Sequence, residues 1–229
     1  MAELKLLSAG AVQPGLMNVI DAFQRETGHG LNATFATAPE IRKRIGQGEA
    51  AHLVIAPPAL LDDLVKTRKT TGERVIVGRI GVGVMVRAGA ALPKITTVDE
   101  FRRSLLDTDS VVYNLASTGI YLETLFVRLG IAAQLRTKTT RYPDAAAVLD
   151  HVRKGKNKEI GFGATTVIVE AKDKGLLFVG PVPAEIQNYT TYTAMMTADG
   201  AARDPAREFL GYLATDVAKA ILAEAGIQT

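Results

Sequence analysis

The sequence predicts an α/β protein of two lobes, each built on a mainly parallel sheet flanked by helices. Apolar runs of strand length alternate with segments of helical period along most of the chain, which is typical of βα units. A strand, a turn of small residues and a helix occur in this order once in each half. Between the halves lies a strand interrupted by glycines, residues 74–87, where a bend is expected. These observations predict two similar lobes that meet at this strand.

The first lobe begins with the strand Leu4–Leu7, a turn of small residues that ends at Ala11, and a helix at about 13–26. Gly28 is expected to end this helix. Its apolar positions fall on one face, as in a helix that packs on a sheet; they are Leu16, Val19, Ile20 and Phe23. The next expected elements are strand 31–36, a helix from Pro39 to about Gly46, strand 53–55 and helix 59–67.

The second lobe repeats this pattern. A capping box, Thr97-x-x-Glu100, predicts a helix at 98–106. The second strand–turn–helix unit comprises strand 110–114, the turn 116–119 and a helix at 119–129. The elements expected to follow are the strands 134–139, 159–162 and 176–179 and the helices 143–153 and 165–173.

The end of the chain is expected to return to the first lobe. The strand-like run 189–196 and the helices 203–214 and 216–226 complete it. The sequence therefore predicts that residues 1–81 and 188–229 form lobe 1 and residues 82–187 form lobe 2. Hinges are expected near residues 81–83 and 182–187.

Composition excludes several classes of partner and site. The 27 basic and 24 acidic residues are interspersed and the formal charge is only +3, so nucleic acid is not an expected partner. The absence of cysteine excludes disulfides and thiolate metal sites, and the three histidines are too far apart in sequence for a metal motif. No apolar run is long enough to span a membrane. We expect a monomer without a cofactor, cytoplasmic as the sequence stands and periplasmic if a signal peptide was removed.

Several stretches, taken in order, resemble a known family. They are Leu7–Ala11, Ile41–Gly48, Leu53–Ala56, Gly119–Leu125, Ile160–Thr165 and the C-terminal run from Ala206 to Leu213. Their order and spacing resemble the molybdate-binding-protein family, which has the type II periplasmic solute-binding fold. The resemblance implies two lobes with a ligand cleft between them, a small anion as ligand and an ABC permease as a candidate partner.

Departures from the family pattern affect the expected ligand. Alanines, Ala11 and Ala38, stand where the resemblance implies two serine hydroxyls, His52 replaces an aspartate, and Gly163 replaces a tyrosine. A desolvated oxyanion needs nearly all of its lone pairs satisfied, and each hydrogen bond to a charged group is worth about 1.5–3 kcal/mol. The sequence therefore favours a larger anion, such as a di- or tricarboxylate, over molybdate.

The candidate ligand-binding residues lie where helices begin after strands, because open N–H groups there favour anions. They are Ser8, Gly10, Ala11, Thr37, Ala38, Ser117, Thr118, Gly119, Tyr121, Arg141, Tyr142 and Thr165. Several have a second interpretation. Ser117, Thr118 and Thr165 are either ligand donors or helix caps. Arg141, expected with Tyr142 in the turn before helix 143–153, either pairs with a carboxylate or is solvated, and Tyr121 either faces the ligand or packs on the sheet.

The leading functional hypothesis is a solute-binding protein of the ABC-transporter type. The alternative is an enzyme on the same fold, since the resemblance also implies relatives that isomerise unsaturated carboxylates such as aconitate. That reaction needs a base, and Glu40, His52 and Tyr121 are the candidates. A third hypothesis is an intracellular ligand sensor.

Overall fold

The computed structural model describes residues 3–70, 72–156, 158–200 and 204–229. The chain forms two compact units: unit 1 comprises Met1–Ile80 and Thr190–Thr229, and unit 2 comprises Gly81–Tyr189. Two strands, β4 (Val75–Arg87) and β9 (Tyr189–Met196), run from one unit into the other. Among the described residues no helix combines the length and the apolar character that a membrane span requires.

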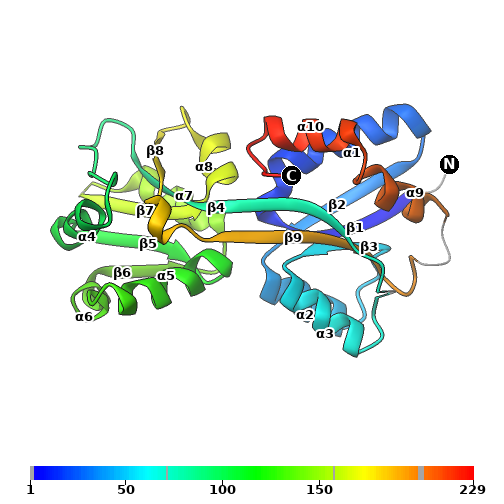
Figure 1. The fold of residues 1–229 in the computed structure, drawn as a ribbon, viewed down its shortest axis with the longest axis horizontal. Helices are drawn as coiled ribbons and strands as arrows, with labels where there is room; N and C mark the ends of the chain where they lie inside the picture. The colour runs from blue at the N-terminus through cyan, green and yellow to red at the C-terminus, as the bar shows by residue number, and fades with distance from the viewer. Residues whose placement is uncertain (1–2, 71, 157, 201–203) are drawn as a thin grey trace. The chain divides into compact units, whose positions relative to one another are not determined.

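Unit 1 contains a sheet in the order β2-β1-β3-β9. The strands β1 (Glu3–Ala9), β2 (Gly30–Ala36) and β3 (Leu53–Ala56) are parallel, and β9 adds antiparallel to β3. Helices α1 and α10 cover one face and α2 and α3 the other (Figure 1). The helices of this unit are α1 (Gln13–Thr27), α2 (Ala38–Gly46), α3 (Pro58–Lys66), α9 (Asp204–Tyr212) and α10 (Asp216–Glu224).

The apolar face predicted for the first helix is confirmed. Leu16, Val19 and Phe23 are completely buried and Ile20 is 2% exposed. The helix ends where expected, because Gly28 takes the left-handed conformation at φ 72° that glycine adopts most readily. The helix predicted at 203–214 begins at Asp204 among the described residues, and its residue 203 lies outside them.

Unit 2 has a sheet in the order β4-β7-β5-β6, with β8 (Leu176–Pro181) paired to β4. The strands β5 (Ser110–Asn114), β6 (Thr139–Tyr142) and β7 (Glu159–Ala164) are parallel, and β4 and β7 are antiparallel. The helices of this unit are α4 (Val98–Asp107), α5 (Ser117–Arg128), α6 (Ala132–Leu135), α7 (Ala145–Lys154) and α8 (Thr165–Ala171) (Figure 1).

Two hydrophobic clusters, one on each face, hold this sheet in place. Alternate residues of a strand point to opposite faces, so Val111 and Val112 of β5 are completely buried in different clusters. The first cluster contains Phe101, Phe126 and Phe162, whose rings meet edge to face. The second joins the strands to α7 and α8. The strand ends of unit 2 therefore rest on a sheet that is buried on both sides.

The capping box predicted for α4 is confirmed, whereas the strand predicted before β6 is wrong. The capping box is present, since Glu100 N–H donates to Thr97 Oγ1 at 3.2 Å. The strand predicted at 134–139 is wrong, because Ala132–Leu135 is helical, Arg136–Lys138 forms a 3₁₀ turn, and the strand starts only at Thr139. Leu135, the apolar residue that suggested a strand, is buried from a helical turn instead.

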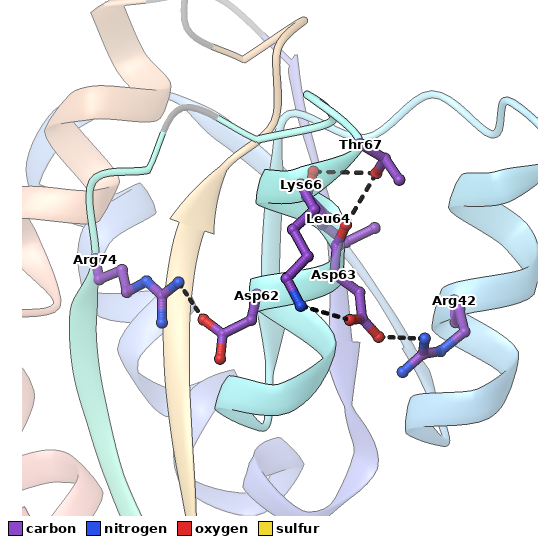
Figure 2. Close-up of polar contacts among 7 residues, drawn as sticks. All are labelled: Arg42, Asp62, Asp63, Leu64, Lys66, Thr67 and Arg74. Carbon is purple, nitrogen blue, oxygen red and sulfur yellow. Dashed lines mark hydrogen bonds and ion pairs between the residues drawn. The ribbon is translucent and has the colours of Figure 1, made fainter.

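Polar contacts on the surface of unit 1 connect α2 to α3 (Figure 2). Asp63 pairs with Arg42 of α2 and lies 4.0 Å from Lys66, while Asp62 accepts a hydrogen bond from Arg74 at 2.5 Å. The two aspartates are 41% and 51% exposed, so each pair is expected to contribute little to stability.

Candidate anion-binding site

In unit 1 the turns after β1 and β2 begin side by side. The parallel register pairs Ala9 with Ala36, the last residues of the two strands. A short 3₁₀ helix, Gly10–Val12, follows Ala9, and α2 follows Thr37. The carboxyl edge of a parallel sheet is where ligands bind in many α/β proteins. Most of the unit 1 candidates therefore share one edge.

This edge offers backbone donors and small side chains. The first i→i−4 bond of α2 runs from Ile41 N–H to Thr37 O at 2.9 Å, so the N–H groups of Ala38 and Glu40 precede it, and Pro39 has none. Thr37 occupies the N-cap position, yet its side chain makes no capping bond. A Cβ at Gly10 would meet nothing within 4 Å. The N-terminal turn of α2 can therefore donate hydrogen bonds through Ala38, Glu40 and the Thr37 hydroxyl.

The corresponding edge of unit 2 is formed by the ends of β5 and β6. Asn114 pairs with Tyr142 in the parallel register. The helix after β5 begins at Ser117, not at 119 as expected from the sequence, and its first i→i−4 bond is from Ile120 N–H to Ala116 O at 3.0 Å. Ser117 and Thr118 therefore lie in the first helical turn, where their N–H groups have no helical acceptor.

Ser117 and Thr118 each carry a hydroxyl at this edge of unit 2. Both residues are partly buried, and neither hydroxyl has a hydrogen-bond partner within the part of the chain that the structure describes. Asn114 Oδ1 accepts from Ala116 N–H at 3.0 Å, which closes the turn before the helix, and no side chain caps α5. The interpretation of these two hydroxyls as caps is therefore not supported.

Asn114 is a structural residue of this site that the sequence reasoning missed. An asparagine at the end of a strand is a common start for a turn closed by its side chain, and this signal was available. Position 119 requires glycine, because a Cβ there would overlap the carbonyl oxygen of Asn114 and lie 2.8 Å from Tyr113 Cδ2. Only glycine lets the first turn of α5 approach β5 this closely.

Four candidates have their polar atoms in other interactions. Ser8 is completely buried and its hydroxyl donates to Ala9 O at 3.3 Å, so the expected ligand hydroxyl is not accessible. Tyr121 donates its hydroxyl to Ile186 O and accepts from Arg128 at 3.3 Å.

Arg141 and Tyr142 differ from their predicted place, because they lie on β6 and not in a turn. Arg141 pairs with Glu123 at 2.5 Å, with its side chain 52% exposed. The Tyr142 hydroxyl lies 2.8 Å from His151 Nδ1. A ligand would have to compete with both of these partners.

The structure does not bring the proposed bases together. His52 precedes β3, at the amino end of the strand, and its Nδ1 accepts from Lys5 N–H at 2.9 Å. Glu40 lies in the first turn of α2, 46% exposed and 3.7 Å from Lys43 Nζ. His52 and Glu40 thus lie on opposite edges of the unit 1 sheet.

The remaining candidate, Thr165, starts the short helix α8 directly after β7 and is partly buried. Its Cγ2 would lie 3.2 Å from a Cβ at Gly83, so its methyl group packs on β4. No group of three or more His, Cys, Asp or Glu in the described ranges is arranged to hold a metal ion.

One group near the unit 2 edge has a shifted pKa. Burial raises the pKa of Tyr113, and the negative charge of Glu123 raises it further while Arg141 lowers it. The Tyr113 phenol is therefore neutral at physiological pH and adds no negative charge at this edge.

The fold and these donor-lined strand ends define a binding protein of the type II periplasmic class. The chain belongs to the bacterial extracellular solute-binding protein family, which it matches over residues 4–228. It is 30% identical to an aconitate isomerase of Pseudomonas sp., over 96% of this chain and 86% of that protein.

Solved structures share the fold at low identity. The periplasmic molybdate-binding protein of Azotobacter vinelandii matches with a TM-score of 0.81 and 18% identity, over 99% of each chain. The sulfate-binding protein SubI of Mycobacterium tuberculosis matches with a TM-score of 0.78 and 16% identity, over 99% of this chain and 86% of that one.

Proposed function

We propose that this protein is a solute-binding protein for a small organic anion with two or three carboxylates. The observation that carries the proposal is the set of hydroxyls without another role, Thr37, Ser117 and Thr118, each at the start of a helix that follows a parallel strand. Neutral donors at such positions stabilise negative charge without a counter-ion.

The pattern of small side chains favours carboxylates over a compact tetrahedral oxyanion. Ala11 and Ala38 offer only methyl groups where the family resemblance implies hydroxyls, and buried Ser8 does not replace them. Each missing hydrogen bond to a charged group would cost about 1.5–3 kcal/mol, which is about one to two orders of magnitude in affinity. Methyl groups and an open Gly10 suit a ligand that carries carbon atoms between its charges.

The comparisons support both parts of this proposal. The matched family is one of extracellular solute-binding proteins, and the relative at 30% identity is named for aconitate, a tricarboxylate. We further propose that the protein acts outside the cytoplasm and delivers its ligand to an ABC permease. Cell fractionation of the native host tests the location, and ligand-dependent ATPase of a co-reconstituted permease tests the partnership.

A binding panel tests the ligand class directly. Thermal shift and calorimetry would compare citrate, both aconitate isomers and succinate with molybdate, tungstate and sulfate. Ligand at about 100 times its Kd adds about 2.7 kcal/mol to the stability of the folded state. Stabilisation by carboxylates is the expected result, and stabilisation by molybdate or tungstate alone would contradict the argument from Ala11 and Ala38.

Substitution of the hydroxyls localises the site. Thr37→Val and Thr118→Val should each weaken carboxylate binding by about 10- to 100-fold, because one hydrogen bond to a charged group is lost. Thr215→Val is the matched control: its hydroxyl accepts from Ala218 N–H at 3.2 Å as an ordinary cap, so it should lower stability by about 1 kcal/mol without changing affinity. If Thr37→Val and Thr118→Val bind carboxylates as tightly as the wild type and the Thr215→Val control do, the site is refuted.

Isomerisation is the second candidate function, favoured by the 30% identity to an aconitate isomerase. Shifting a double bond requires removal of an allylic proton, so turnover in D₂O should place deuterium in recovered aconitate. Glu40→Gln should abolish exchange if this carboxylate is the base, whereas Lys43→Gln serves as its neighbouring control. Tight binding of aconitate without deuterium exchange would contradict isomerisation and leave solute binding as the one proposed function.

Two predictions from the sequence are carried forward in this proposal. Closure of the lobes on the ligand stays a prediction, and small-angle X-ray scattering with and without citrate tests it. The expected monomer also stays a prediction, which light scattering tests.

A further inference from the structure

The chain enters and leaves unit 2 beside Val82 of β4. Unit 2 begins at Gly81 and ends at Tyr189. Both β8 and β9 are neighbours of β4 in the sheet. The chain that connects β8 to β9, residues 182–188, forms no strand of its own. The pairing of β4 along these two strands is therefore interrupted where the chain crosses between the units.

The side chain of Gln187 takes the place of a strand in this interruption. Its Oε1 accepts from Val82 N–H at 2.8 Å and its Nε2 donates to Val82 O at 3.0 Å. Oε1 also accepts from Asn188 N–H at 2.9 Å. A side-chain amide carries the donor and the acceptor of a peptide group, so it bonds to both backbone groups of one residue as a neighbouring strand would. Val82 is only 3% exposed, so its backbone groups need partners within the protein.

Glycine at position 81 leaves room for this amide. A Cβ there would lie 3.2 Å from Gln187 Cδ and Nε2, and equally close to Tyr189 Cε1. Interiors are packed so closely that such a contact would push the amide away from the strand. The absence of a side chain at Gly81 therefore lets the Gln187 amide lie against β4.

Tyr121 connects the same segment to α5. Its hydroxyl donates to the backbone oxygen of Ile186. Ile186 and Val182 are buried in the hydrophobic cluster that also contains Val82, and the Tyr121 ring packs against this cluster. The segment 182–188 is thus attached to unit 2 through α5, through the core and through the backbone of β4.

We propose that Gln187 is a clamp that joins β4 to the start of β9, so that the two crossovers leave unit 2 as one rigid pair. Bending between the units is then confined to the parts of β4 and β9 that belong to unit 1. Residues 81–83 and 182–187, predicted as hinges from the sequence, are the rigid part of the connection. Since the clamp consists of residues of unit 2 alone, it acts whatever ligand the protein binds.

Distance distributions between two spin labels test this proposal on the full chain. The chain contains no cysteine, so Val217→Cys on α10 and Val127→Cys on α5, both more than half exposed, provide specific labelling sites. Gln187→Met has a side chain of similar length without the amide and should give a wider distribution than the wild type. Gln134→Met is the matched control, because this glutamine is exposed on α6 of the same unit, and it should leave the distribution unchanged.

Amide hydrogen exchange measured by NMR reports on the clamp bonds themselves. In Gln187→Met the N–H groups of Val82 and Asn188 should exchange about 2- to 10-fold faster, because each loses one hydrogen bond. Tyr121→Phe removes the bond to Ile186 O and should also widen the distance distribution. If Gln187→Met does not fold, the Tyr121→Phe variant decides.

Two results would overturn the proposal. Faster exchange with an unchanged distance distribution would show that Gln187 only stabilises unit 2, as any buried hydrogen bond does. Unchanged exchange of Val82 and Asn188 in a folded Gln187→Met variant would show that the clamp bonds do not hold these groups. A circular dichroism spectrum equal to that of the wild type establishes that each variant is folded.

Discussion

Replacing Gly119 with alanine tests whether α5 is held against β5 as closely as the structure indicates. The added Cβ would overlap the carbonyl oxygen of Asn114 and lie 2.9 Å from its carbonyl carbon. Both are backbone atoms, so no side-chain rotation relieves the contact. The strand cannot yield easily either, because Val111 and Val112 are completely buried.

The expected magnitude follows from two opposing effects. Overpacking of this kind costs about 1–3 kcal/mol or more, and replacing glycine in a helix returns at most about 1 kcal/mol. We expect the free energy of unfolding to fall by about 1–2 kcal/mol, which lowers the melting temperature of a chain of this length by roughly 2–8 °C. Carboxylate affinity should fall as well, since Ser117 and Thr118 move with the helix.

Urea denaturation monitored by circular dichroism measures the change, with Gly211→Ala as the control. Gly211 lies in α9 and a Cβ there would meet nothing within 4 Å, so this substitution should raise stability by about 0.5 kcal/mol. A Gly119→Ala variant as stable as the wild type would refute the packing argument. Loss of stability in both variants would point to a cause other than the Asn114 contact.

Three further predictions concern stability. Thr97→Ala removes one half of the capping box of α4 and should cost about 1 kcal/mol by urea denaturation; no loss would show that the cap is dispensable. Asp63→Asn removes an exposed ion pair with Arg42 and should lower stability by less than about 1 kcal/mol, a loss that disappears at ~1 M salt. Leu61→Ala, at a completely buried position, should cost about 2–5 kcal/mol at any salt concentration. Burial raises the pKa of Tyr192 to about 12. Because the unfolded phenol ionises near 10, stability should be complete below pH ~10 and fall by roughly 2–3 kcal/mol as pH rises to ~12, and Tyr192→Phe should abolish this part of the loss.

The fold was predictable where one local pattern decided the structure. The apolar stripe of α1, the Gly28 stop and the Thr97 cap each depend on a few consecutive residues, and each is present as expected. The segment before β6 failed because a buried leucine fits a helical turn as well as a strand. Leu135 is buried from α6, and only contacts distant in sequence decide between these alternatives.

The candidate site was predictable by position but not by side-chain role. The sequence located the helix starts after β1, β2 and β5, because small residues and hydroxyls gather there. It could not indicate that Ser8 turns into the core or that Tyr121 bonds to Ile186, 65 residues away. Such partners are brought together by the sheet order, which no short segment encodes.

The order in which the ribosome synthesises this chain affects the folding of unit 1. Its strand β3 pairs with β9, which is synthesised only after all of Gly81–Tyr189. At about 5–20 residues per second this delay lasts roughly 5–20 s. During that interval β3 is a bare apolar edge that can pair with other nascent chains, and unit 2 is complete only at its end. Chaperone demand during synthesis should therefore concentrate on the first 80 residues, and a chain terminated before residue 190 should fold unit 2 but aggregate through unit 1.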